Sequence, residues 1–191
     1  MGCSIGSKHL DPADIELEKE ISLGRICNRS IEFENLLQIL FQAKNIESHL
    51  TALDNILYIL SRSKHHLHLF ETYPHAYKSL IDTSLKYKCN LSVTIKLFEI
   101  FVLISPSIKS KAKLHILNAC NIVIFSIKKF IQTDQVVELG CKIICYLSSD
   151  KNCLETFRRS DWKKIHSDLI QFDFPNTTQV WIHHANNMIC N

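Results

Sequence analysis

The residues best placed for chemistry are at the start of the chain, which reads Met-Gly-Cys-Ser-Ile-Gly-Ser-Lys. Removal of Met1 exposes the amine of Gly2 as an acceptor for myristate, and the neighbouring Cys3 thiol is an acceptor for palmitate. The usual myristoylation pattern has Ser or Thr at position 6, where this chain has Gly6. One myristoyl chain binds a membrane only marginally, so we expect acylation of both residues. A chance Met-Gly-Cys start is the alternative.

Histidines and cysteines provide the other reactive side chains. His65, His66 and His68 lie close together and His183 is followed by His184, but adjacent histidines point to different faces of a helix, whereas zinc needs ligands that converge. The chain has eight cysteines without a Cys-x-x-Cys pair, and we expect reduced thiols, several of them in the core. We predict no metal, no cofactor and no catalytic residue, because no nucleophile or phosphate-loop motif is present.

Charge and hydropathy narrow the possible partners. The net charge of +3 and the pI near 8.4 are too mild for a nucleic-acid-binding surface. We interpret the lysines at 109–113 and 128–129 as solvated helix faces. No apolar run reaches the ~18 residues that a membrane-spanning helix needs.

The elements that must position these residues are helices. Glycine and proline are scarce, four of each, and the apolar residues show helical rather than strand periodicity. We expect residues 1–29 to form the acylated anchor with an acidic linker helix from Asp11 to about Leu23, and residues 30–191 to form one helical domain. The expected helices of that domain are Ile31–Ala43, Glu47–Arg62, Lys64–Glu71, His75–Lys88, Leu91–Ser105, Lys109–Ile131, Gln135–Ser148, Lys151–Arg158, Asp161–Phe172 and Thr177–Cys190.

A repeat of 43 to 44 residues relates these segments. The spacing connects Ile56, Ile100 and Ile143, and the same register relates two further columns: Leu60, Ile104 and Leu147, and Ser61, Ser105 and Ser148. Three serines that each close an apolar helix are a stronger signal than apolar coincidences alone. A period near 43 is typical of armadillo and HEAT repeats.

Residues 135–172 resemble an armadillo repeat, with a long helix ending at Cys145-Tyr146-Leu147-Ser148-Ser149, a short helix near 152–157 and a third helix. The resemblance covers about three repeats over residues 47–190 and a partial one at 31–43. The glycine that normally joins the short helix to the next is missing near Tyr73 and Ser160. The resemblance implies an all-α, short armadillo-like superhelical solenoid of three to four repeats.

Armadillo proteins commonly bind extended peptides through an Asn ladder beside aromatic residues on the long helices. The matching ladder positions here are Ile59, Leu103 and Tyr146, and the matching aromatic positions are Asn55, Glu99 and Lys142. None of the first three is Asn and none of the second three is Trp. These six residues therefore predict a surface for a helix or a folded protein partner rather than for an extended peptide.

Together these observations predict a non-enzymatic adaptor on the cytoplasmic face of a plasma membrane or an internal membrane. The resemblance to dually acylated armadillo proteins, which anchor motors and tethers to organelles, implies that the solenoid recruits a cytosolic protein. The alternative is a soluble, all-helical regulatory subunit without a lipid anchor. Trp162 and Trp181 are expected to be buried anchors of their helices.

Overall fold

The computed structural model describes residues 25–62 and 64–190, with only the backbone for residues 25–32. This part of the chain is helical without strands, which confirms the all-α class. Gly2, Cys3 and the expected helix from Asp11 to Leu23 lie outside the described residues. The helices are α2 (Arg25–Gln42), α3 (Ile46–Leu60), α4 (Lys64–Thr72), α5 (Ala76–Lys86), α6 (Leu91–Ile104), α7 (Ile108–Ile116), α8 (Ala119–Lys129), α9 (Asp134–Leu147), α10 (Lys151–Arg159), α11 (Trp162–Leu169) and α12 (Asn176–Cys190).

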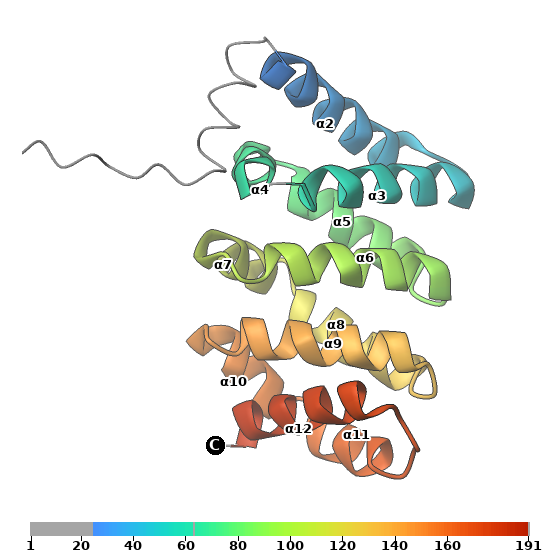
Figure 1. Ribbon diagram of the computed structural model, residues 1–191, viewed down its shortest axis with the longest axis vertical. Helices are drawn as coiled ribbons and strands as arrows, with labels where there is room; N and C mark the ends of the chain where they lie inside the picture. Colours follow the sequence, from blue (N-terminus) through green and yellow to red (C-terminus); the bar gives the residue numbers. More distant parts are fainter. Residues whose placement is uncertain (1–24, 63, 191) are drawn as a thin grey trace, which may run out of the picture.

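The helices form two layers with a row of short helices along one edge (Figure 1). The long helices α3, α6, α9 and α12 pack side by side in the first layer. The helices α5, α8 and α11 lie behind them, and α2 packs against both α3 and α5 at the end of the stack. The short helices α4, α7 and α10 connect the two layers. One long helix followed by two shorter helices therefore occurs three times between residues 46 and 169.

Side-chain caps explain where several helices begin. The carboxamide oxygen of Asn45 accepts a hydrogen bond from the amide of Ser48 at 2.8 Å, and that of Asn90 accepts one from Val93 at 3.0 Å. The carboxylate of Asp150 accepts from the amides of Asn152 and Cys153, both at 3.0 Å. Such caps satisfy amides that have no partner inside the helix.

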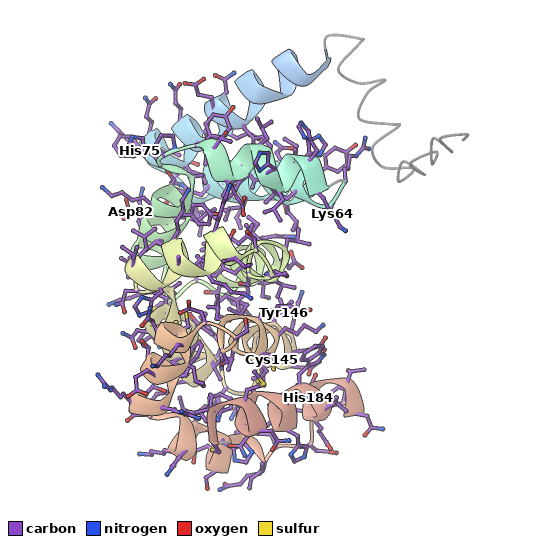
Figure 2. All side chains as sticks on the ribbon, turned by 90° about the vertical axis from the view of Figure 1, so that its left-hand side faces the viewer. Lys64, His75, Asp82, Cys145, Tyr146 and His184 are labelled. Atoms are coloured by element: carbon purple, nitrogen blue, oxygen red, sulfur yellow. The ribbon has the colours of Figure 1, made fainter. Side chains whose placement is uncertain are left out.

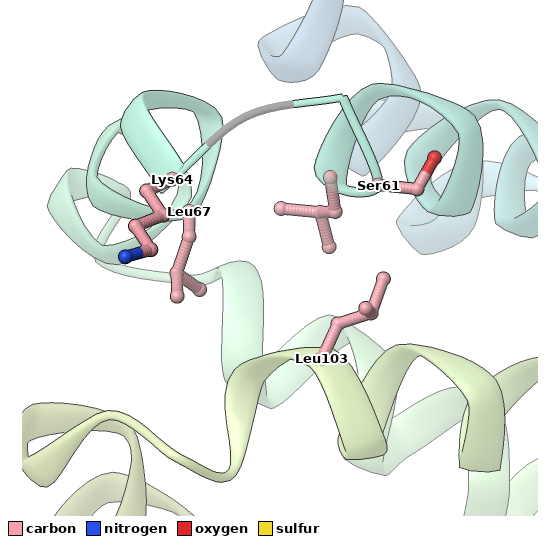
Figure 3. A pocket seen from close by; sticks show the side chains of 5 residues that line it. Ser61, Lys64, Leu67 and Leu103 are labelled. Carbon is pink, nitrogen blue, oxygen red and sulfur yellow. The ribbon is translucent and has the colours of Figure 1, made fainter. Parts of the chain in front are cut away.

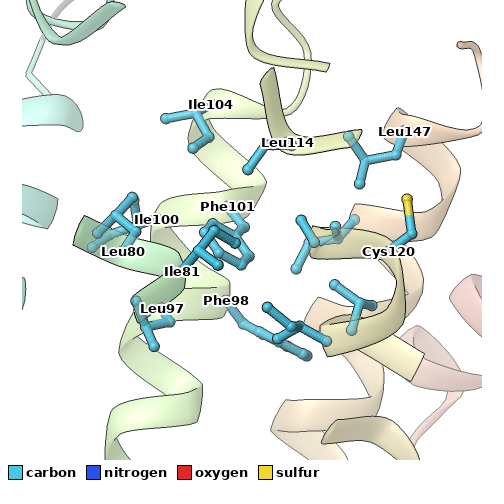
Figure 4. Packing of buried hydrophobic residues seen from close by; sticks show 14 of the residues in the cluster. Leu80, Ile81, Leu97, Phe98, Ile100, Phe101, Ile104, Leu114, Cys120 and Leu147 are labelled. Atoms are coloured by element: carbon cyan, nitrogen blue, oxygen red, sulfur yellow. The ribbon is translucent and has the colours of Figure 1, made fainter. Parts of the chain in front are cut away.

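The residues related by the 43-to-44-residue spacing are similarly buried in the structure. Ile56, Ile100 and Ile143 are all fully buried between the layers, and Leu60, Ile104 and Leu147 are also buried. Ser61, Ser105 and Ser148 each follow the last residue of a long helix, as the serine column predicted. Figure 4 shows α6 at the centre of this core, where Phe98, Phe101 and their neighbours meet side chains from α5, α7, α8 and α9.

The structure differs most from the predicted helix boundaries at two places. The expected single helix over residues 109–131 is wrong, because Leu117 and Asn118 separate α7 from α8. Asn118 adopts the left-handed conformation, with φ of 64° and ψ of 27°, which an α-helix cannot contain and which Asn tolerates better than most residues. At the other end of the domain, α2 begins at Arg25, six residues before the expected start at Ile31.

Candidate partner-binding surface

The outward side of the first layer brings most of the predicted partner-binding residues together. We define the long-helix face as Asn55 on α3, Glu99 and Leu103 on α6, Lys142 and Tyr146 on α9, and Trp181 and His184 on α12. Because the four helices pack side by side, residues at equivalent register positions form columns across the layer (Figure 1). Glu99, Leu103, Lys142, Tyr146 and Trp181 are half-buried, whereas Asn55 and His184 are exposed.

Leu103 lies at the mouth of a pocket of about 320 Å³ between α3, α4 and α6. The pocket is lined by Leu60, Ser61, Lys64, Leu67 and Leu103, so aliphatic side chains form most of its wall and Lys64 stands at its rim. In Figure 3 the side chain of Leu103 points up from α6 toward α3, and Leu67 faces it from α4. This arrangement forms a recess with a mostly aliphatic wall.

Aromatic side chains gather at the other end of the face. The Tyr146 ring on α9 lies 6.4 Å from the Trp181 ring on α12, and His184 is 5.9 Å from Trp181 between ring centroids. The ammonium of Lys142 sits 5.4 Å from the centre of the Trp181 ring, a cation–π arrangement. Figure 2 shows Tyr146 and His184 on the same side of the molecule. Large, half-exposed aromatic side chains of this kind are the usual anchors of protein interfaces.

Ion pairs compensate the charges between these apolar groups. The ammonium of Lys96 lies 3.0 Å from Asp54 on α3 and 3.4 Å from Glu99 on its own helix. The hydrogen bond with Asp54 raises the pKa of Lys96 and keeps this lysine charged. Lys142 pairs in the same way with Glu138, one turn earlier on α9. The face therefore offers apolar contact area between charges that already have partners.

Two of the predicted residues contribute less than expected. Ile59 is only 5% exposed and packs into the core, so its assignment to the accessible surface is corrected. The reason is that the side chain at this position of α3 turns toward the neighbouring helices rather than outward. Asn55 is exposed on α3, away from the aromatic end of the face. The accessible apolar part thus runs from Leu103 through Tyr146 to Trp181.

Comparison with protein-family models, with curated proteins and with solved structures finds no match to this chain.

The histidines and cysteines are distributed without a common centre. His66 is buried on α4, whereas His68 and His183 are exposed. Among the described residues no group of three or more His, Cys, Asp or Glu is arranged to hold a metal ion. Burial raises the pKa of the Cys145 thiol to about 11, so this thiol is neutral at physiological pH. Cys141, one turn earlier on α9, is fully buried.

The polar cluster around Glu71, whose side chain is 8% exposed, was not predicted from the sequence. Its carboxylate accepts hydrogen bonds from the hydroxyls of Ser107 and Ser110, and Ser110 also bonds the Tyr77 hydroxyl at 2.6 Å. Lys113 donates to the Glu71 carbonyl at 2.9 Å. The cluster joins α4 and α5 to α7, and its hydrogen bonds satisfy groups that would be costly to bury alone.

Trp181 was also missed as a surface residue, since a buried position was expected for it. Trp162 is buried, as predicted, and its indole donates to Asn186 at 3.3 Å. The repeat register did not contain this signal, because a spacing of 43 or 44 residues relates Lys142 to Ala185 or Asn186 and leaves Trp181 outside the columns.

Among residues 25–62 and 64–190, no helix combines the length and apolar character required to cross a membrane.

Proposed function

We propose that this protein is a membrane-anchored, armadillo-like adaptor that recruits a cytosolic protein to a membrane. In this proposal, acyl chains on Gly2 and Cys3 hold the chain at the cytoplasmic face, and the long-helix face binds the partner. The observation that carries it is the set of half-buried side chains Leu103, Tyr146 and Trp181 on three long helices that pack side by side. A set of this kind spans three helices, the extent that a helical or folded partner covers.

The repeated helix order supports an armadillo-like solenoid. Three successive units have a long helix followed by two shorter helices, and their long helices pack side by side. Where the armadillo pattern has a glycine between the two shorter helices, the middle unit has Asn118 in the left-handed conformation. The helices α2 and α12 continue the two layers at the ends, which makes the solenoid about three to four repeats long.

The polar clusters fit a structural role better than a catalytic one. Thr178 is buried and donates hydrogen bonds to Asp134 and Glu138 of the neighbouring long helix. Around Glu71 the donors and acceptors are likewise directed at one another. Side chains that satisfy each other in this way stabilise the contact between repeats rather than presenting a reactive group to a substrate.

The direct test of recruitment is a charge placed among these side chains. We expect Leu103→Asp and Tyr146→Asp each to weaken partner binding by at least tenfold, because a carboxylate at the centre of an interface must be desolvated without a counter-charge. Partners are identified by proximity labelling on membranes with the wild-type chain, and their binding to purified variants is then measured.

A matched control is Leu85→Asp on α5, since Leu85 is 55% exposed and lies in the second layer. All three variants should keep the circular dichroism spectrum of the wild type. Equal binding by the wild type, Leu103→Asp and Tyr146→Asp, with all of them folded, would exclude the long-helix face as the recruiting surface.

A further inference from the structure

The row of short helices at one edge of the molecule is unusually basic. We define the short-helix edge as α4, α7 and α10, which lie together along one side in Figure 1. These helices contain seven Lys or Arg residues and two Glu residues, and they also contain four histidines. The four long helices, by contrast, contain five Asp or Glu residues and two Lys residues. Positive charge is therefore concentrated on the edge and not on the long-helix face.

The same edge also has the most exposed large apolar side chains. Ile108 is 84% exposed and Ile116 is 79% exposed, the two highest values among the large apolar residues whose side chains are described. Both belong to α7, and the exposed Ala112 lies between them on the same face because the three residues are spaced by four. Lys109 is exposed beside this stripe. Ser110 and Leu114, on the opposite side of α7, are buried.

Lysines recur near the start of each short helix. Lys64, Lys109 and Lys151 are the first or second residues of α4, α7 and α10, and all three are exposed. Figure 2 views the molecule from this edge, with Lys64 near the first layer. Each short helix thus has one exposed ammonium group in its first turn, and that of α7 lies next to the protruding Ile108.

We propose that the short-helix edge docks on an anionic lipid surface, with its lysines at the headgroups and Ile108 and Ile116 inserted at their acyl boundary. This inference rests on the proposed membrane location. Aliphatic side chains that protrude among lysines are suited to a soft lipid surface, into which they can insert. A protein partner would instead need a complementary recess for each isoleucine.

Docking of the short-helix edge would add an electrostatic contribution to membrane binding, which the first eight residues do not provide. Lys8 is the only basic residue among the first eight, so the acyl chains have no polybasic segment beside them. Attraction between Lys or Arg residues and an anionic leaflet strengthens membrane binding and orients the bound protein. With the short-helix edge on the lipid, the long-helix face points sideways, parallel to the membrane, and stays open to a partner.

The test uses the full chain produced without acylation, so that its outcome does not depend on Gly2 or Cys3. Binding is measured by flotation with phosphatidylcholine vesicles that contain or lack phosphatidylserine. We expect binding only with phosphatidylserine and a decline as salt is raised, because salt screens exposed charges. Changing Lys64, Lys109 and Lys151 together to Glu should weaken binding at least about tenfold.

The matched control changes Lys129, Lys163 and Lys164, which are exposed on α8 and α11, to Glu, so its net charge is identical. It should retain binding within about threefold of the wild type. Ile108→Ser with Ile116→Ser should also weaken binding, whereas Leu85→Ser with Ile170→Ser should not, since these residues are 55% and 59% exposed elsewhere.

Three outcomes would overturn the proposal. The first is a wild-type chain that does not bind phosphatidylserine vesicles, and the second is an equal loss of binding in both triple-lysine variants. The third is an edge variant that binds vesicles normally but loses an acidic protein partner, which would assign the edge to a protein. None of these outcomes bears on acylation, which is measured separately on Gly2.

Discussion

Some buried polar side chains of the described residues have partners on neighbouring helices, and Tyr77 is the clearest example. Its hydroxyl lies 2.6 Å from that of Ser110, 33 residues further along the chain. Burial is the main cause that raises its pKa to about 12, and the negative charge of Glu71 contributes in the same direction. In the folded protein Tyr77 therefore keeps its proton at pH values at which a tyrosine of the unfolded chain has lost it.

This difference predicts a loss of stability at alkaline pH. Between pH 10 and about pH 12 the unfolded chain loses the Tyr77 proton while the folded chain keeps it, so the free energy of unfolding falls as pH rises. The contribution is fully present below pH 10. Tyr77→Phe should flatten the fall, which urea unfolding at a series of pH values would measure. A tyrosine absorbance titration of the folded protein in which Tyr77 ionises near pH 10 would contradict this prediction.

Periodicity predicted which apolar residues are buried but not which polar residues are. The repeat predicted that Ile100 and Leu147 are buried, because their burial depends only on which face of the helix they occupy. Glu71 and His66 are buried for another reason, since their environment is made by other helices. A single sequence does not show which residues pair with Glu71, because its partners Ser107 and Ser110 are 36 and 39 residues away.

At the scale of helices, Gly140 allows the close approach of α9 to its neighbours. A Cβ atom at this position would lie 2.6 Å from Cγ1 of Ile127 on α8 and 3.2 Å from Cε2 of Phe98 on α6. Both neighbours are buried and have little room to move. Glycine is otherwise unfavourable inside a helix, so close packing explains its position in the middle of α9.

We expect Gly140→Ala to destabilise the protein by about 1–3 kcal/mol, because overpacking outweighs the gain of about 1 kcal/mol in helix propensity. Ala112→Gly serves as the reverse control at an exposed helical position and should cost about 0.5–1 kcal/mol. Chemical denaturation of both variants measures the two effects. An increase in stability for Gly140→Ala would mean that α8 and α9 pack less closely than described.

Helix boundaries were predictable where a cap or proline marks them, and less so elsewhere. Asn90 and Asp150 are capping residues that the sequence displays directly. The break at Asn118 has no proline or glycine, and the apolar pattern continues across it. Its position is related by 43 residues to His75 and Asp161, which precede α5 and α11, so the repeat register locates the break better than local sequence does.

At the scale of the whole molecule, the stack of long helices is held by the repeated core columns. Leu147→Ala should reduce the free energy of unfolding by about 2–5 kcal/mol, because it removes a fully buried side chain between repeats. The exposed Lys151→Ala should change it by less than about 0.5 kcal/mol. Thermal unfolding of the two variants distinguishes them, and equal shifts would show that Leu147 is not a core position.

The arrangement of the long helices could be predicted from the sequence because it depends on helix length and on the period of the apolar pattern. The serine column and the apolar columns predicted equivalent long helices, and the structure confirms that Ser105 and Ser148 end two of them. Which residues lie on the surface was harder to predict. Ile59 was placed on it although its side chain packs into the core, and Trp181 was placed in the core although it is half exposed. Both depend on how neighbouring helices rotate against each other.

The central proposal is an adaptor held on a membrane through Gly2 and Cys3, and membrane fractionation of a Gly2→Ala variant tests it most directly. Cells expressing the wild type or the variant are labelled with a clickable myristate analogue and separated into membrane and soluble fractions. The proposal predicts that the wild type incorporates the analogue and is found with membranes. Because palmitoylation of Cys3 follows transient membrane binding through myristate, it also predicts that Gly2→Ala loses the label and shifts to the soluble fraction. A Gly2→Ala chain that fractionates with membranes as the wild type does would contradict the acyl anchor.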